Sequence, residues 1–320
     1  MTTFARSLES DRFLVYLQRY GAIVALLLTL GVAALLAPEL YQPGNLSNVM
    51  RQAAMLGIVA IGQTLVLLTA GIDLSVGAVI GLAAIVIAEY TGGQDALLWS
   101  GVALTLTLGA LVGLANGWLV TKRNVPPFIA TLGMLVFVEG ARFAYTRGVP
   151  SGTLPAALRY LGTGQLGPFP VSFIMWIVLS LIGILLLRRT PYGWQLYATG
   201  GNWLAARLSG VNVDRIVAST YVISALLASL TGLILSGYIG YIDRYIGTGF
   251  DLDSIAAAVV GGTSFVGGKG GLGGTIAGVL FMSFLLNLIL ILNLAVEWQL
   301  VVKGAVIVGA VALYQSAERA

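Results

Sequence analysis

The chain has 320 residues, of which 58% are hydrophobic and only 9% are charged, and its mean hydropathy is +0.93. Soluble domains carry about 25% charged residues, so this composition predicts an integral membrane protein with little mass outside the bilayer. Cysteine and histidine are both absent. Their absence excludes disulfides and thiol nucleophiles and removes the usual metal ligands, so a redox or metal enzyme is not expected, although carboxylate chemistry stays open.

Ten apolar segments follow one another without a long polar insert. They lie at 21–37, 49–70, 74–90, 97–120, 126–146, 170–187, 216–238, 252–267, 272–293 and 298–314. Because lipid-exposed backbone must satisfy its own hydrogen bonds, we predict a single all-α transmembrane domain over 1–320 with about ten membrane helices. Segment 252–267 is short and glycine-bearing. It is either a full span or a pair of half-helices that enter and leave from one side.

The basic residues predict the orientation of these helices. Ten spans place both termini on one side, and eleven of the 17 basic residues fall there: Arg6, Arg12, Arg19, Lys122, Arg123, Arg188, Arg189, Arg207, Arg215, Lys269 and Arg319. Five fall on the other side: Arg51, Arg142, Arg147, Arg159 and Arg244. The positive-inside rule therefore predicts cytoplasmic termini and a cytoplasmic loop at 188–215. We interpret the net charge of +4 as orientation, not as affinity for nucleic acid.

The 188–215 loop is predicted to carry a short helix. Asn202 is a good N-cap and Gly210 a good C-terminal stop, and about seven residues between them would span roughly 10 Å. Leu204 and Leu208 share a face. The alternative is an amphipathic helix on the bilayer, but two leucines bind a membrane weakly, so docking on another protein is favoured. The residues predicted to make this contact are Asn202, Leu204, Ala205, Ala206, Arg207, Leu208 and Gly210.

Polar residues inside the apolar segments are candidates for a translocation pathway: Gln63, Asp73, Asn116, Thr131, Thr263, Ser264 and Asn287. Hydrogen bonds between helices explain most such residues, and Asp73 and Ser75 could simply cap the following helix. Asp73 would cost about 3 kcal/mol at mid-membrane unless it is paired or hydrated. The sequence leaves open whether Lys303, in the last span, pairs or extends to the interface.

Two further patterns concern symmetry and nucleotides. The tetrads 71–74 and 249–252 both read Gly, an apolar residue, Asp and Leu, and they fall on opposite faces of the membrane, as an inverted repeat would place them. The glycine-rich segment 259–271 superficially suggests a phosphate loop. It fails the Walker pattern, because Gly270 follows Lys269 where Ser or Thr is needed. We therefore expect no bound cofactor or metal, and any ATP is used by a partner.

Four ordered blocks carry a family resemblance: Gly71–Gly77, Asn116-Gly117 with Pro126–Met134, Tyr197–Gly210 and Asp251–Gly271. With these blocks the chain resembles, over nearly its whole length, the permease subunits of bacterial ABC importers for ribose, xylose, arabinose and related sugars. Ala205-Ala206 followed by Gly210 is similar to the EAA-type coupling loop of importer permeases, although Leu204 stands where that motif often has Glu.

The resemblance implies a multi-pass subunit of the bacterial inner membrane that performs no bond chemistry. It implies partner ATPase subunits, a periplasmic sugar-binding protein and a second permease, in a homodimer or a heterodimer. Permeases for nucleosides or branched-chain amino acids are relatives and stay open as alternatives. A secondary transporter with its own ion site is a rival, disfavoured because the embedded acids form no clear relay.

Overall fold

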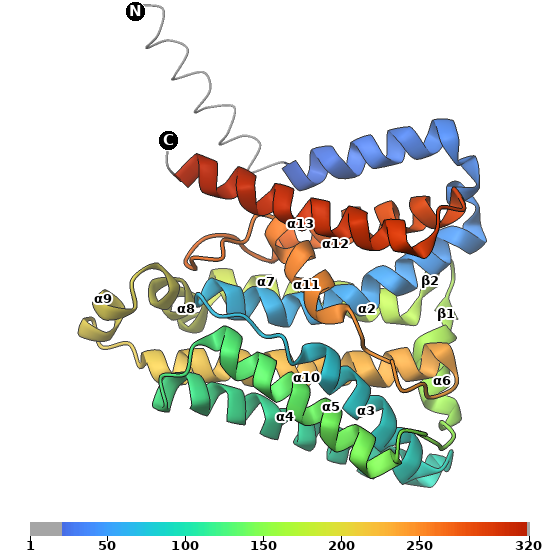
Figure 1. The fold of residues 1–320 in the computed structure, drawn as a ribbon, viewed down its shortest axis with the longest axis horizontal. Coiled ribbons are helices and arrows are strands. Elements are labelled where there is room, and N and C mark those ends of the chain that lie inside the picture. Colours follow the sequence, from blue (N-terminus) through green and yellow to red (C-terminus); the bar gives the residue numbers. More distant parts are fainter. Residues whose placement is uncertain (1–20, 319–320) are drawn as a thin grey trace, which may run out of the picture.

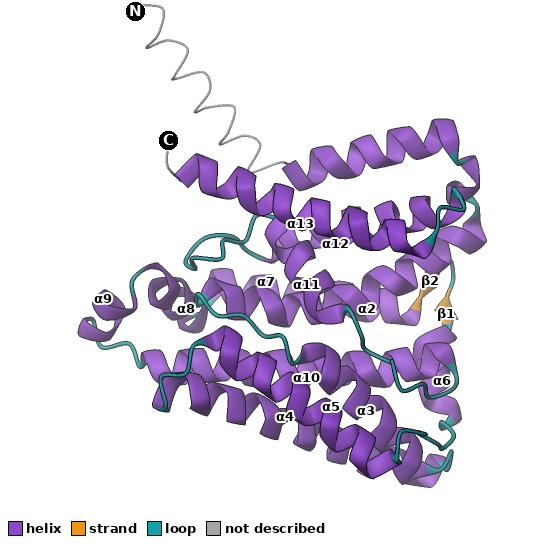
Figure 2. Ribbon diagram, in the orientation of Figure 1, coloured by secondary structure: helices purple, strands orange, loops and turns teal. Residues whose placement is uncertain are grey.

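The computed structural model describes residues 21–318, so Arg6, Arg12, Arg19 and Arg319 lie outside the described part. Within it the chain is almost entirely helical, apart from a small hairpin of β1 (Gln165–Leu166) and β2 (Phe169–Pro170) (Figure 2). In chain order the helices are Gly21–Leu36, α2 (Pro43–Leu68), α3 (Val76–Thr91), α4 (Leu98–Lys122), α5 (Pro127–Thr146), α6 (Ala156–Thr163), α7 (Val171–Arg189), α8 (Pro191–Gly201), α9 (Trp203–Leu208), α10 (Val213–Ile239), α11 (Phe250–Val260), α12 (Leu272–Ile291) and α13 (Val296–Glu318), with 3₁₀ turns η1 (Pro38–Tyr41) and η2 (Asp95–Leu97).

Each of the ten predicted apolar segments contains a helix, so the prediction of an all-α polytopic membrane protein is confirmed. Among the described residues, six helices are long and apolar enough to cross a membrane. Segment 252–267 forms neither a full helical span nor a pair of half-helices, so both alternatives given for it were wrong. The helix there ends at Val260 and its 11 residues reach about 16 Å, roughly half of the hydrocarbon thickness. Gly261 and Gly262 end it, and a non-helical segment continues to Gly271.

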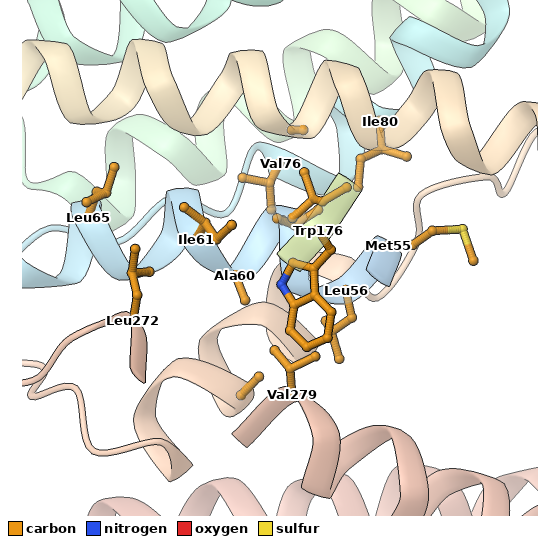
Figure 3. Close-up of a cluster of buried hydrophobic side chains, with 14 of the residues drawn as sticks. Met55, Leu56, Ala60, Ile61, Leu65, Val76, Ile80, Trp176, Leu272 and Val279 are labelled. Carbon is orange, nitrogen blue, oxygen red and sulfur yellow. The ribbon is translucent and has the colours of Figure 1, made fainter. Parts of the chain in front are cut away.

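Helices α2 and α10 form the centre of the bundle and run antiparallel to each other (Figure 1). They cross where Gly62 faces Ser224, since a Cβ on Gly62 would lie 2.7 Å from Ser224 Cα. The absence of a side chain at position 62 therefore sets how closely the two helices approach. Trp176 of α7 occupies the space beside Gly57 on the other side of α2 and packs with Leu56 and Val279 (Figure 3).

Each central helix is followed by a non-helical segment that returns into the bundle before a shorter helix begins. Segment 69–75 leads from α2 to α3, and segment 240–249 leads from α10 to α11, at the opposite end of the molecule (Figure 1). Segment 240–249 packs against the start of α3 inside the bundle, where a Cβ on Gly77 would lie 2.7 Å from Gly247 O. This opposed arrangement of the two tetrads is what an inverted repeat produces. In each half, the break is followed by a helix shorter than the central one, 16 residues in α3 and 11 in α11.

The two ends of the bundle differ in charge. One end holds α8, α9, the C-termini of α4 and α7, and the 261–271 loop (Figure 1). It therefore gathers the described basic residues that the sequence assigned to the cytoplasm: Lys122, Arg123, Arg188, Arg189, Arg207, Arg215 and Lys269. The other end holds α6, the hairpin and the 240–249 segment, together with the five arginines assigned outside. The fold thus places the two predicted groups of basic residues at opposite ends of the bundle.

Candidate translocation and coupling site

Asp73 lies fully buried in the break between α2 and α3. Its Oδ1 accepts hydrogen bonds from the backbone N (3.0 Å) and the hydroxyl (2.6 Å) of Ser75, which fixes the turn before α3. Its Oδ2 accepts a hydrogen bond from the Ser224 hydroxyl of α10 at 2.9 Å. The carboxylate therefore holds the local turn and also ties it to the central helix of the other half. Helix α3 has no side-chain cap, so the suggestion that Asp73 and Ser75 cap it was wrong.

Two more helices converge on this turn. Asn116 of α4 donates to Ser75 Oγ at 2.9 Å. Gln63 of α2, with its amide oriented to satisfy the backbone, donates to Asp73 O at 3.0 Å and accepts from Asp73 N at 3.3 Å. Together with Ser224 these residues form what we call the Asp73 network, and each of them is fully buried. Within the described residues these hydrogen bonds satisfy the network except at Asn116 Oδ1, which has no partner. Buried polar networks favour one arrangement to the extent that their members are satisfied.

The seven predicted pathway residues do not all gather there. Thr131 of α5 joins the edge of the network by donating to Ile72 O at 3.3 Å. Asn287 instead exchanges two hydrogen bonds with Asn45, at 2.9 and 3.2 Å, and joins α12 to the start of α2. Thr263 and Ser264 are buried in the glycine-rich loop, where Ser264 Oγ accepts from Val266 N. The structure thus separates Gln63, Asp73, Asn116 and Thr131 from the other three.

Helix α9 has the ends that the sequence predicted, over six residues. The Asn202 side chain accepts a hydrogen bond from Ala205 N at 2.9 Å, which confirms the N-cap. At the other end Gly210 has a φ of +87°, its N–H donates to Arg207 O, and Val211 N donates to Ala206 O. This pair of bonds is a Schellman termination, which needs a left-handed residue and so favours glycine.

Helix α9 has one exposed face with large apolar side chains and one face that packs against the rest of the chain. Leu204 and Leu208 are 52% and 82% exposed, and Trp203 beside them is 57% exposed. Ala205 also lies on the surface, whereas Ala206 is buried and packs against the core of the chain. The apolar surface that a partner could cover therefore consists of the large side chains, and Ala206 serves internal packing.

A pair of ionic contacts fastens α9 to the long helices. Arg207 Nη2 lies 2.5 Å from Asp214 Oδ1 at the start of α10, and Lys122 Nζ at the end of α4 lies 2.7 Å from Asp214 Oδ2. The Arg207 guanidinium also lies 5.6 Å from the centroid of the Trp203 ring. Asp214 was missed by the sequence analysis, because nothing local signals that it meets a lysine 92 positions away.

Glycine contacts connect α8 to both non-helical segments at this end. A Cβ on Gly200 would overlap Leu68 O, the carbonyl to which Gly268 N donates at 3.0 Å. The Tyr197 hydroxyl donates to Gly270 O at 2.9 Å. Burial raises the pKa of Tyr197 above its ordinary value, partly offset by Arg188, so the hydroxyl stays protonated as a donor at neutral pH. The α8–α9 segment is therefore in backbone contact with the end of α2 and with the glycine-rich loop.

Two further residues of this architecture escaped the sequence analysis. Ser224 gave no signal, because serines are common in membrane helices and only the fold opposes it to Asp73. Arg142 of α5 is buried and donates to Ile246 O at 3.3 Å and Arg244 O at 3.2 Å. It thereby fixes the 240–249 segment at the end of the bundle that the positive-inside rule assigns to the outer side.

Lys303 of α13 pairs with Asp253 of α11, with 2.8 Å between Nζ and Oδ2. The sequence left open whether Lys303 pairs or extends to the membrane interface, and the structure shows that it pairs. Both side chains are largely buried.

Replacing Lys303 by methionine should destabilise the protein by about 3–5 kcal/mol, because it leaves a buried carboxylate unpaired. The double variant Lys303→Met/Asp253→Leu should recover most of that loss. Thermal unfolding in detergent checks this, and equal losses in the single and double variants would contradict it.

Comparison with known proteins agrees with this architecture. Residues 45–311 match the family described as the permease component of the branched-chain amino acid transport system. The chain therefore belongs to this family of multi-pass membrane permeases. No solved structure matches it.

Three Escherichia coli K12 proteins are among its relatives, and each is compared over most of both chains. The ribose import permease protein RbsC is 39% identical over 92% of this chain and 93% of its own. The galactose/methyl galactoside import permease protein MglC is 33% identical over 96% and 97%. The xylose transport system permease protein XylH is 33% identical over 86% of both. The resemblance drawn from the four sequence blocks is thereby confirmed.

Proposed function

We propose that this chain forms half of the membrane channel of an ATP-driven importer for a monosaccharide of the pentose or hexose class. The relatives named above, each a sugar permease by name, support the substrate class. The observation that carries the proposal is the continuity between an exposed, capped helix and a break in the membrane domain. Helix α9 presents Leu204 and Leu208 outward, while α8 touches Leu68 directly before the Asp73 turn.

In this proposal α9 docks on a partner ATPase at the cytoplasmic face of the bacterial inner membrane. Movement of α9 would pass to α10 and α4 through Asp214, and to segment 69–75 through Gly200. The Asp73 network then joins α2, α3, α4 and α10 in one arrangement, and a second arrangement would open access from the other side. The energy comes from ATP bound by the partner, since the sequence carries no Walker pattern.

The remaining partners follow from the same assignment. A periplasmic sugar-binding protein would deliver its ligand to the opposite end, which carries α6, the hairpin and the 240–249 segment. A second permease subunit, identical or homologous, would complete the channel. Membrane lipid covers the exposed apolar side chains of the spans, such as Leu28, Phe137 and Leu185.

The proposal is tested by purifying the chain in detergent from its native host and identifying the subunits that accompany it. An ATPase subunit should co-purify, and the complex in vesicles should accumulate sugar only when ATP is present. Uptake should persist when an uncoupler collapses the ion gradients. A chain that purifies alone and moves solute at the expense of an ion gradient would instead establish the secondary-transporter rival.

Replacing Gly210 by tryptophan should abolish uptake while leaving membrane insertion intact. A non-glycine residue with positive φ costs about 1–2 kcal/mol, and the loss of the Schellman end would reorient α9. Gly210→Asn is the matched control, because asparagine tolerates the left-handed conformation and should retain most activity. Normal uptake by Gly210→Trp would contradict the role of α9.

A further inference from the structure

A cavity of about 520 Å³ lies directly behind the coupling helix. Its wall includes Asn202, Trp203 and Arg207 but neither Leu204 nor Leu208, so it adjoins the apolar face that we assign to the ATPase without including the two leucines of that face. The rest of the wall comes from the end of α4 with the turn after it, the start of α5, the start of α10, segment 69–71, the end of α8 and the glycine-rich loop. The cavity thus touches every element through which we propose that α9 acts, and its volume is within the range of small-molecule sites.

A buried hydroxyl group in this wall, that of Thr199, has no hydrogen-bond partner among the described residues. Thr199 is 3% exposed and its hydroxyl is unsatisfied, whereas the fully buried Tyr221 hydroxyl lies beside the backbone of Ile72. An unsatisfied buried hydroxyl costs about 1–3 kcal/mol, so such groups normally meet a ligand or an ordered water. Tyr221 lies beside Gly71, at the deep end of the cavity next to the Asp73 turn.

The other groups in the wall define the chemistry of a ligand. Arg207 and Asp214 already form an ion pair, so the wall carries no net charge. Thr121 and Asn124 add neutral polar groups, and the half-exposed indole of Trp203 offers an apolar face. This combination of hydroxyls, an amide and one aromatic ring fits a small neutral polyhydroxylated molecule better than an anion or an amino acid.

We propose that this cavity is a second binding site for the transported class of solute, a neutral monosaccharide, on the cytoplasmic side of each subunit. A ligand there would join α9 to α4, α10 and segment 69–71, and so would resist the movement that coupling requires. Sugar accumulated inside the cell would then slow ATP hydrolysis by the importer. The binding claim stands on the cavity itself, and the regulatory claim rests on the proposed function.

The first test measures binding to the purified full-length chain, without ATPase or receptor, by equilibrium dialysis against labelled D-ribose, D-xylose and D-galactose. At least one of them should bind saturably. Thr199→Val removes the unsatisfied hydroxyl at nearly constant volume and should weaken that binding by roughly fivefold. Thr199→Ser, which keeps the hydroxyl, should restore it.

The matched control is Thr107→Val on α4, because Thr107 is exposed and its hydroxyl is satisfied by Ala103 O. It should leave sugar binding unchanged. Absence of saturable binding by the wild-type chain would overturn the proposal. Binding that Thr199→Val does not weaken would place the sugar elsewhere and overturn it as well.

The second test adds the same sugar to the assembled complex and measures ATP hydrolysis. The sugar should inhibit the wild-type complex, whereas Thr199→Val should need about fivefold more for the same inhibition at an unchanged basal rate. If the complex imports sugar with ATP but binding and inhibition are absent, the second site is wrong and the proposed function stands. If binding depends on Thr199 but transport needs no ATPase, the proposed function is wrong, and the claim of regulation is overturned with it.

Discussion

Replacement of Gly200 by alanine is expected to abolish uptake completely. A Cβ at this position would overlap Leu68 O and approach Gly268 N to 2.6 Å, so backbone atoms on both sides would have to move. Overpacking typically costs about 1–3 kcal/mol and costs more when no side chain can yield. Because Leu68 O also accepts from Gly268 N, the substitution would separate α8 from the end of α2 and the glycine-rich loop together.

The neighbouring Gly201 provides the matched control, since a Cβ there would meet nothing within 4 Å. Gly201→Ala should transport normally, and both variants should reach the membrane in similar amounts. Radiolabelled sugar uptake in cells, normalised to the amount of chain in the membrane, checks the pair. Full uptake by Gly200→Ala would show that this contact is not needed for coupling.

Replacement of Asp73 by leucine is the second large expected effect. The substitution leaves the hydroxyls of Ser75 and Ser224 without their acceptor inside the bundle. Each orphaned buried group costs about 1–3 kcal/mol, so we expect a clear fall in the thermal unfolding temperature together with loss of uptake. The break between α2 and α3 would lose both its local turn and its attachment to α10.

Asp73→Asn separates the contribution of the hydrogen bonds from that of the charge. Asparagine keeps one acceptor for Ser75, and its amide can donate to Ser224 Oγ. This variant should therefore unfold close to the wild-type temperature and retain part of its uptake. If Asp73→Leu unfolded at the wild-type temperature in detergent, the Asp73 network would not be the structural centre that we describe.

Local features of the chain were predictable because their causes are local. Each apolar segment located a helix, and Asn202 and Gly210 marked both ends of α9, since capping depends on a few neighbouring residues. The two related tetrads likewise indicated the two opposed breaks. Where the hydropathy pattern was ambiguous, at 252–267, the length of the helix was decided by glycines that end it at Val260.

Contacts between distant segments could not be predicted from a single sequence. Ser224 and Asp73 are 151 positions apart, and Lys122 and Asp214 are 92 positions apart, so only the packing of α2, α4 and α10 brings them together. Asn287 shows the opposite case. It had the same sequence character as Gln63 and Asn116, but its partner is Asn45, far from the Asp73 turn. Polarity within a span identified buried groups but not which groups share a site.

The central claim is that α9 is the contact for the ATPase, and the absence of cysteine from the chain makes a direct measurement simple. Leu208→Cys places a single thiol at a position that is 82% exposed on α9, and Tyr241→Cys places one at a 66% exposed position on the opposite end. A thiol-to-amine cross-linker applied to the purified complex should join the ATPase subunit to the chain at position 208 and not at position 241. Cross-linking at 241 with none at 208 would contradict the account.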